Sequence, residues 1–440
     1  MLVVDELTDK WSDNDYWGGR QPFTHIWHKL ITEWIKRDRN RPSIILWSLG
    51  NELQIREGWA GFEGTNDWGI TTYNIFNQLV KRWDNTRLTT VAMFPARAGA
   101  ITRHDKEFND YLVPPELACA TEVASFNYQS DKYDAYLKYK PDLILFQSEA
   151  ETSNLLQPYY NMDRKRTVGM AYWGSAEYWG ESNKWPKKGW NYSFFDHTMR
   201  PYPQAYLIKS AFMPEIPEVH IGVVDAAGAE SVSWNDVIVG RMALNECWNH
   251  TPGSRQSLFT FTNAHSVELL VNGQSMGVQE NDTTQANLRN MIYWKDVPYG
   301  NGGSVVAIAR DKSGKEVARH HIETAGKAVA LRIEAETPAD WKADGMDLQY
   351  INVTAIDKKG RPVWDYNKPL TLQMEGAAWL VALDNGDHYT DELFHGITSK
   401  RMYQGRMQII LRSTKTPSNV KLEISSADLK EKLSLKTSLK

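Results

Sequence analysis

The sequence predicts a multidomain protein in which a parallel β/α sheet is followed by two all-β sandwich domains. Residues 1 to about 212 alternate short apolar runs with segments whose apolar residues recur at helical spacing. After Pro214-Glu215-Ile216-Pro217 the pattern changes to alternating strands with glycine-containing turns. A chain of 440 residues is also long enough for two or three domains.

The first half contains six strand-like runs separated by helical or loop crossovers. The predicted strands are Leu2–Glu6, Ile44–Leu49, Leu88–Phe94, Val123–Tyr128, Leu143–Ser148 and Val168–Trp173. Helical spacing of apolar residues predicts helices at Phe23–Arg37 and Tyr73–Trp83. Runs that are apolar throughout indicate strands buried on both faces, as in a parallel sheet covered by helices. Six strands are two fewer than a closed eight-stranded barrel contains.

The second half consists of short strands that end in turn signals. Val267–Val271 is followed by Asn272-Gly273, a two-residue hairpin signal. Ser304–Arg310 and Tyr350–Ile356 are likewise followed by polar segments that contain glycine. A joint at Thr324-Ala325-Gly326 divides this half into two modules. We therefore expect three domains, at residues 1–213, 214–325 and 326–440.

The composition argues against several classes of partner and site. Lysine plus arginine number 50 and aspartate plus glutamate 54, so no charge excess indicates a nucleic-acid or membrane partner. No apolar stretch approaches the ~18–20 residues that span a bilayer. Cys119 and Cys247 are far apart in sequence and form neither a disulfide framework nor a metal-like cluster. The 18 tryptophans suit a carbohydrate ligand, because aromatic faces stack on sugar rings, although large aromatics also fill cores.

Two glutamates each follow an apolar run of strand length. Ile44–Leu49 leads into Gly50-Asn51-Glu52, and Leu143–Phe146 leads into Gln147-Ser148-Glu149. Catalytic residues of a parallel barrel lie at the carboxyl ends of its strands, so both carboxylates are expected at one rim. There they could supply the acid and the nucleophile that break a glycosidic bond. An acidic residue at a strand end is usually only solvated, so this hypothesis depends on the flanking sequence.

The flanking sequence resembles a known enzyme family. The run from Arg37 through Glu52 closely resembles the acid/base signature of glycoside hydrolase family 2, the family of β-galactosidases, β-glucuronidases and β-mannosidases. Other segments resemble the ends of its third, sixth, seventh and eighth barrel strands and its closing helix: Val4–Glu6, Ser125–Tyr128, Phe146–Glu149, Gly169–Trp173 and Pro203–Phe212. The resemblance implies a partial (β/α)8 TIM barrel, containing strands 3–8, followed by two Ig-like β-sandwich domains.

The resemblance also implies roles for individual residues. Glu52 matches the general acid/base and Glu149 the nucleophile of a retaining β-glycosidase, with β-galactosides as the expected substrates. Asn51 matches the residue that hydrogen-bonds the sugar 2-hydroxyl, and Tyr128 matches a tyrosine that contacts the nucleophile. Trp173 matches the aromatic floor of the sugar pocket. No cofactor is implied, and His25, His28 and His104 show no metal-ligand spacing.

Two further residues complete the expected substrate-binding set, and some positions leave alternatives open. Asn127 lies in the segment that resembles the sixth strand. Glu6, at the end of the third strand, could line the pocket or pair with a nearby arginine. Glu151 is an alternative nucleophile two residues after Glu149, and Tyr128 could be a core aromatic.

The chain also departs from the family pattern. Arg41 occupies a position where many members have histidine. Counterparts of the family's N-terminal sugar-binding domain, first Ig-like domain and first two barrel strands are absent, so we expect a truncated enzyme, an incorrectly started reading frame or one part of a split enzyme. Leu2–Val4 would then be an exposed hydrophobic edge, which a homo-oligomer or a missing N-terminal portion would cover. The family resemblance also indicates a periplasmic or secreted protein.

Three functions are compatible with these patterns. The first is a retaining β-glycosidase acting on an oligo- or polysaccharide substrate. The second is a folded but catalytically silent fragment, because a small misplacement of sugar-orienting groups lowers the rate greatly. The third is a carbohydrate-binding module formed by residues 218–440, although their strands show no sugar-binding pattern beyond ordinary core aromatics.

Overall fold

The chain separates into two compact units. The computed structural model describes residues 2–11, 21–53, 69–94, 113–152, 155–182, 185–225, 231–234 and 237–439. The first unit comprises Met1–Trp173 with Val232–Val239, and the second comprises Gly174–Ser231 with Gly240–Lys440. Within the described ranges, no helix has the length and apolar character needed to cross a membrane.

The first unit is built on a six-stranded parallel sheet, as the sequence predicts. Its strands lie side by side in chain order, from β1 at one edge to β6 at the other. The strands are β1 (Val3–Glu6), β2 (Ile44–Asn51), β3 (Leu88–Met93), β4 (Val123–Asn127), β5 (Leu145–Ala150) and β6 (Thr167–Tyr172). The helices are α1 (Phe23–Asp38), α2 (Ile70–Trp83), α5 (Glu116–Ala120), η2 (Ser130–Lys132), α6 (Tyr133–Tyr139) and α7 (Gln157–Asn161). The expected partial barrel is confirmed.

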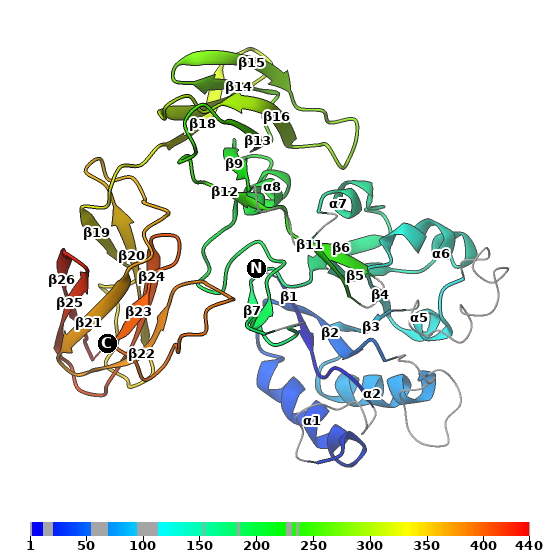
Figure 1. Cartoon of the computed structure of the whole chain (residues 1–440). Coiled ribbons are helices and arrows are strands. Elements are labelled where there is room, and N and C mark those ends of the chain that lie inside the picture. Colours follow the sequence, from blue (N-terminus) through cyan, green and yellow to red (C-terminus); the bar gives the residue numbers. More distant parts are fainter. Residues whose placement is uncertain are drawn as a thin grey trace. The chain divides into compact units, whose positions relative to one another are not determined.

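Most residues of the inner strands β2 to β5 are buried, which explains why these strands are largely apolar, whereas the edge strands β1 and β6 are partly exposed. Helices α1 and α2 lie side by side and share a core with the sheet (Figure 1). In that core Trp47 packs edge-on against Trp34, with ring centroids 4.9 Å apart, and its indole N–H donates to Asp84 Oδ2 at 2.9 Å. Leu46, the neighbour of Trp47 on β2, belongs instead to a separate cluster with Phe146.

Strand β5 differs from its predicted bounds. The backbone N–H of Leu143 donates to Lys140 O at 3.2 Å and closes a turn, so the strand begins at Leu145. Pairing with β6 continues to Ala150. Glu149 therefore lies inside the strand, where its backbone is held by ladder contacts, rather than after the strand end.

The second unit contains two antiparallel β-sandwiches, each made of two four-stranded sheets, which confirms the all-β part of the predicted fold. A short pair and a helix precede them: β7 (Tyr178–Trp179), β8 (Gly189–Trp190) and α8 (Pro203–Phe212). The first sandwich pairs sheet β12-β9-β13-β16 with sheet β15-β14-β17-β18. Its strands are β9 (Val219–Val224), β12 (Leu244–Asn245), β13 (Arg255–Thr262), β14 (Ser266–Val271), β15 (Gln274–Glu280), β16 (Met291–Pro298), β17 (Ser304–Arg310) and β18 (Glu316–Glu323).

The second sandwich pairs sheet β19-β20-β24-β22 with sheet β23-β21-β25-β26. Its strands are β19 (Ala330–Ala335), β20 (Leu348–Ile356), β21 (Pro369–Glu375), β22 (Ala378–Asp384), β23 (Ser399–Arg401), β24 (Arg406–Ser413), β25 (Asn419–Ser426) and β26 (Leu429–Lys436). Strands β10 (Ser231–Trp234) and β11 (Val237–Gly240) form a separate two-stranded sheet.

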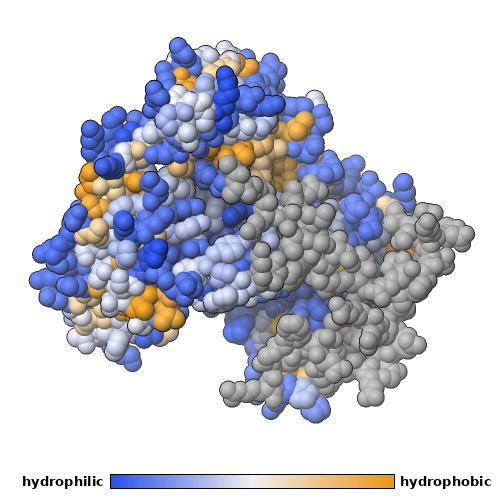
Figure 2. Space-filling view, in the orientation of Figure 1, coloured by the Kyte–Doolittle hydropathy of each residue, from blue (hydrophilic) through white to orange (hydrophobic). Residues whose placement is uncertain are grey.

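Each sandwich encloses its own core. Trp248 and Trp294 are buried in the first, and Trp341 is buried in the second. On the surface drawn in colour in Figure 2, hydrophilic residues predominate and hydrophobic ones are scattered among them. The alternation of buried and exposed positions along the strands produces this division. The domain boundaries expected after residues 213 and 325 stay predictions.

Candidate active site

Glu52 follows directly on β2 and is buried at the carboxyl end of that strand. The residue is 7% exposed, and its backbone N–H donates to Ala92 O of β3 at 2.7 Å. Its φ of 43° is a left-handed conformation that is uncommon outside glycine. Such strain persists where surrounding structure fixes the residue, and it concentrates at functional sites. Two residues before Glu52, Gly50 lies so close to Trp11 that a Cβ would come within 2.6 Å of Trp11 Nε1.

Glu149 lies on β5 beside a tyrosine that donates to it. The Tyr128 hydroxyl donates to Glu149 Oε2 at 2.5 Å, and the Tyr128 backbone N–H donates to Glu149 O at 2.8 Å. Tyr128 also has a positive φ, of 59°, and its ring meets Phe94 edge-on with centroids 5.9 Å apart. A short hydrogen bond to a carboxylate favours its ionised form.

Asn127, the last residue of β4, connects the surroundings of the two glutamates. Its Nδ2 donates to Asn51 Oδ1 at 2.9 Å and lies 3.3 Å from Glu52 Oε1. Its Oδ1 accepts from Ser148 Oγ at 2.7 Å, and its backbone pairs in register with Glu149. Asn127 is fully buried, so this amide holds a fixed position between the two strand ends.

Asn51 is oriented by two charged residues that follow β1. Asn51 Nδ2 donates to Asp9 Oδ1 at 3.1 Å, and the Asn51 backbone N–H donates to Asp9 O at 2.7 Å. Lys10 Nζ donates to the same Asp9 oxygen at 2.6 Å and to Asn51 O at 3.0 Å. The side chain of Asn51 thus has both its oxygen and its nitrogen fixed by hydrogen bonds.

Glu6 ends β1 and lies within electrostatic range of Glu52. Ser48 Oγ donates to Glu6 Oε2 at 2.7 Å, and among the described residues no ion pair joins Glu6 to an arginine. Part of Glu6 reaches solvent, whereas protein atoms surround its carboxyl group. The resulting loss of hydration raises its pKa to about 7; the nearby carboxylate of Asp9 adds to this shift and the Ser48 hydrogen bond opposes it.

Trp173 immediately follows β6. Its backbone N–H donates to Ala150 O at 3.0 Å, so it lies beside the end of β5, one residue beyond Glu149. Its assignment as the floor of a sugar pocket stays a prediction.

The arrangement places two carboxylates in different surroundings near the carboxyl ends of β2 and β5, two strands of the same parallel sheet. One is buried against an amide, and the other accepts from a phenol. Carboxyl groups held in different environments can divide proton donation from nucleophilic attack. Among the described residues, the two groups of side chains that could hold a metal ion both lie in the second unit.

No sequence motif marks the residues that orient this site. Asp9, Lys10 and Ser148 carry no motif of their own, although Ser148 is adjacent to Glu149. Asp9 and Lys10 lie more than forty residues from the asparagine that they contact. No local spacing could have linked them to Asn51.

Family models match three parts of the chain. Residues 12–171 match the glycosyl hydrolases family 2 TIM barrel domain, and residues 331–433 match the glycoside hydrolase family 2 C-terminal domain 5. Residues 253–318 match a domain of unknown function. The barrel match lies in the first compact unit and the C-terminal match in the second, and both indicate glycoside hydrolase family 2.

Known proteins match this chain, some of them over nearly its whole length. It is 24% identical over 482 aligned positions to beta-galactosidase BoGH2A of Bacteroides ovatus, covering 98% of this chain and 54% of that protein. A beta-glucuronidase of Formosa agariphila is 26% identical over 168 positions, covering 38% of this chain and 14% of that protein. A crystal structure of a glycosyl hydrolase family 2 member from Bacteroides cellulosilyticus matches with a TM-score of 0.79 and 25% identity, covering 99% of this chain and 53% of that one. The chain thus spans about half the length of the first relative and of this structure.

Proposed function

Because the chain belongs to glycoside hydrolase family 2, we propose that it hydrolyses terminal β-glycosides, specifically β-galactosides, with retention of configuration. The observation that carries the proposal is the hydrogen-bonded connection from Glu52 through Asn127 to Ser148, the neighbour of Glu149. It relates carboxylates on two strands that are not adjacent in the sheet. The sugar is assigned from the B. ovatus β-galactosidase, which matches 98% of this chain.

In the proposed first step Glu149 is the nucleophile and Glu52 the acid. The Glu149 carboxylate attacks the anomeric carbon, while the Glu52 carboxyl group gives its proton to the glycosidic oxygen and the alcohol leaves. The Tyr128 hydrogen bond supports this assignment, because it favours an ionised Glu149 ready to attack.

In the second step Glu52 acts as a base instead of an acid. Its carboxylate takes a proton from water, the water oxygen attacks the anomeric carbon, and the bond to Glu149 breaks. Asn127 supports both steps as a positioning residue, since its amide fixes one Glu52 oxygen at 3.3 Å. Free product and the starting protonation states are then restored.

The remaining residues would bind the sugar. We assign Asn51 to the 2-hydroxyl, because Asp9 and Lys10 fix its orientation. Trp173 would stack on the apolar face of the ring, and Glu6 would contact a hydroxyl. We also propose residues 1–213 as the barrel part of the catalytic domain, with sandwiches at 214–325 and 326–440.

The first experiment assays the 440-residue chain against four aryl β-glycosides: galactoside, glucuronide, mannoside and glucoside. Turnover of the galactoside alone supports the full proposal. Turnover of one of the other three glycosides would correct the proposed sugar specificity but support the proposed reaction. Silence on all four, from protein shown to be folded by circular dichroism, favours the catalytically silent alternative.

The second experiment tests the nucleophile directly. An aryl 2-deoxy-2-fluoro-β-galactoside slows hydrolysis of the covalent intermediate, so mass spectrometry should find one sugar attached to Glu149. Glu149→Gln should abolish labelling and turnover, whereas Glu116→Gln, an exposed carboxylate at the start of α5, should change neither. Labelling of Glu151 instead would refute the assignment of the nucleophile.

A further inference from the structure

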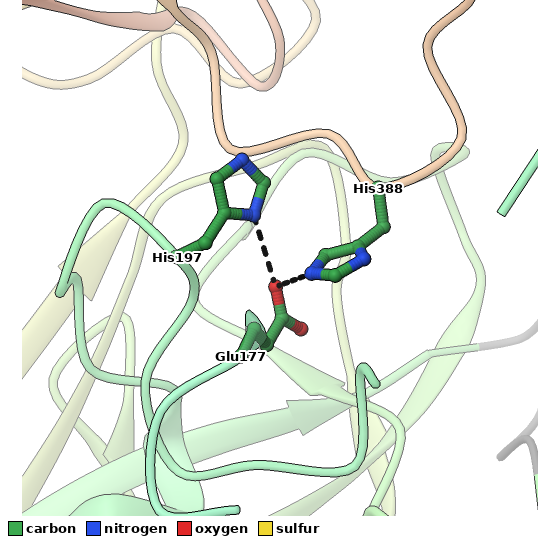
Figure 3. A group of neighbouring side chains, drawn as sticks. All are labelled: Glu177, His197 and His388. Atoms are coloured by element: carbon green, nitrogen blue, oxygen red, sulfur yellow. Dashed lines mark ion pairs between the residues drawn. The ribbon is translucent and has the colours of Figure 1, made fainter. Parts of the chain in front are cut away.

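Three side chains of the second unit, none of them part of the candidate active site, converge on one point. Glu177 precedes β7, His197 lies between β8 and α8, and His388 follows β22. Figure 3 shows one nitrogen of each imidazole ring directed at the same carboxylate oxygen of Glu177. The side chains are buried, with exposed fractions of 1% for Glu177, 7% for His197 and 3% for His388.

The distances within this group fit the edges of a metal-coordination tetrahedron. Glu177 Oε2 lies 3.5 Å from His197 Nδ1 and 3.1 Å from His388 Nε2. All three atoms lie within 4.8 Å of one another. Zinc bonds of ~2.0–2.2 Å to imidazole and carboxylate in a tetrahedron place the ligand atoms about 3.3 Å apart.

The converging atoms also lack hydrogen bonds. Glu177 Oε2, His197 Nδ1 and His388 Nε2 are buried, and no described residue forms an aligned hydrogen bond with them. Buried polar atoms almost always have a hydrogen-bond partner, whereas these three face one another only through unaligned contacts of 3.1 and 3.5 Å, an arrangement that requires an explanation. A bound cation would use all three lone pairs at once.

In His197 and Glu177, the nitrogen or oxygen that does not face the centre of the group contacts another side chain. His197 Nε2 lies 2.8 Å from Asp384 Oδ1; in the neutral tautomer whose Nε2–H donates to Asp384, the lone pair of Nδ1 faces Glu177. Glu177 Oε1 accepts from the Tyr202 hydroxyl at 2.8 Å and from Arg241 Nη1 at 3.0 Å, which leaves Oε2 for the centre. At metal sites, a ligating histidine commonly donates its other ring N–H to a carboxylate, and this hydrogen bond fixes the tautomer of the histidine.

A cavity gives access to the group. It has a volume of about 200 Å³ and is lined by Glu177 and His388 together with Tyr202, Arg241 and Tyr403, all residues of the second unit. An ion could enter through this space, and a water molecule in it could take the fourth coordination position.

We propose that Glu177, His197 and His388 bind a divalent transition-metal ion of the zinc type. Two imidazoles and one carboxylate match the ligands that zinc prefers, whereas calcium and magnesium favour oxygen ligands alone. The ion joins the loop after β22 to the segment that follows the barrel sheet, so its role is to stabilise the second unit. The proposal is independent of the glycosidase activity.

A second group with metal-ligand atoms, His220, Glu246 and His320, is arranged differently. The His220 ring stacks on Tyr206 with centroids 3.5 Å apart and lies 3.9 Å from the His320 ring. His320 Nδ1 already accepts the backbone N–H of Ile221 at 3.1 Å. This group is therefore explained by stacking and hydrogen bonding, and it serves as a comparison in the test.

The test measures zinc binding by the full chain after removal of metal with a chelator. Calorimetry and elemental analysis should find one zinc per chain lost in His388→Gln but retained in the exposed control His265→Gln and in His320→Gln. Asp384→Asn should weaken binding by about 10–100-fold, because it removes the carboxylate behind His197. Undiminished binding in His388→Gln, or loss in His320→Gln alone, would overturn the proposal.

A measurement on the unsubstituted chain keeps the test decisive if the His388 variant fails to fold. Cobalt bound by two imidazoles and a carboxylate in a four-coordinate site absorbs strongly in the visible range, whereas hydrated octahedral cobalt absorbs weakly. Strong absorption that zinc abolishes at one equivalent supports the site. Weak absorption, or none that zinc displaces, would show that the three side chains form only a buried charge network.

Discussion

Replacing Tyr128 by phenylalanine tests the assignment of Glu149 with a single lost atom. The variant removes the hydroxyl that donates to Glu149 Oε2 at 2.5 Å. It keeps the aromatic ring that meets Phe94 edge-on. The backbone hydrogen bond from residue 128 to Glu149 O is also kept. Any change should therefore report on the carboxylate and not on packing.

The expected decrease in kcat/KM follows from the negative charge of the hydrogen-bond acceptor, the Glu149 carboxylate. A hydrogen bond to an ionised group contributes about 1.5–3 kcal/mol, which corresponds to a decrease in kcat/KM of roughly 10–150-fold. Loss of the donor also disfavours the ionised form of Glu149, so the acid limb of the pH–rate profile should move to higher pH.

The assay compares kcat/KM for an aryl β-galactoside across roughly pH 4–9 in the unsubstituted chain and two variants. The matched control is Tyr133→Phe, which removes a buried hydroxyl that donates to Phe146 O at 3.0 Å in the same unit. The control should leave the acid limb unmoved. Equal effects of both variants, or a Tyr128→Phe profile that coincides with the parent, would refute the role given to this hydrogen bond.

Three further predictions follow from individual contacts. Asn127→Ala should lower kcat/KM at least as much as Tyr128→Phe, because it removes contacts to both strand ends, with circular dichroism unchanged. Gly50→Ala should destabilise the first unit by about 1–3 kcal/mol in urea unfolding, since the new Cβ would meet Trp11 Nε1 at 2.6 Å. His320 gives a pH dependence: burial and then the nearby His220 lower its pKa to about 4, from 6.5. Its neutral form is thus favoured by folding, and the second unit should lose about 2 kcal/mol of stability between pH 7 and pH 5, a loss that His320→Gln should reduce.

Each of these predictions has an outcome that contradicts it. Full activity in Asn127→Ala would show that the amide does not position the acid/base. An unchanged urea midpoint in Gly50→Ala would show that Trp11 moves aside without cost. A steeper loss of stability on acidification in His320→Gln than in the parent would show that other groups dominate the titration.

The sequence by itself determined the class of fold and the two candidate carboxylates. The run Ile44–Leu49 is apolar at every position except Ser48, and its length and residue types are typical of a strand buried on both faces. Because parallel strands present their carboxyl ends at one edge, the positions of Glu52 and Glu149 along the chain were enough to place both at that edge. The residues from Arg37 to Glu52 indicated the family because they form one contiguous motif, which can be recognised without knowledge of the fold.

The tertiary structure alone decided which side chains surround those carboxylates and what lies elsewhere. Asn127 reaches Glu52 across 75 positions of sequence, and His197 meets Asp384 across 187. Such contacts depend on where the loops lie after strands and sheets have packed. The periodic pattern of apolar residues carries no information about which distant loop residues will meet. Local pattern therefore fixes strands and their ends, whereas convergence of loop residues, as in the group of Glu177, His197 and His388, arises only when the chain is folded.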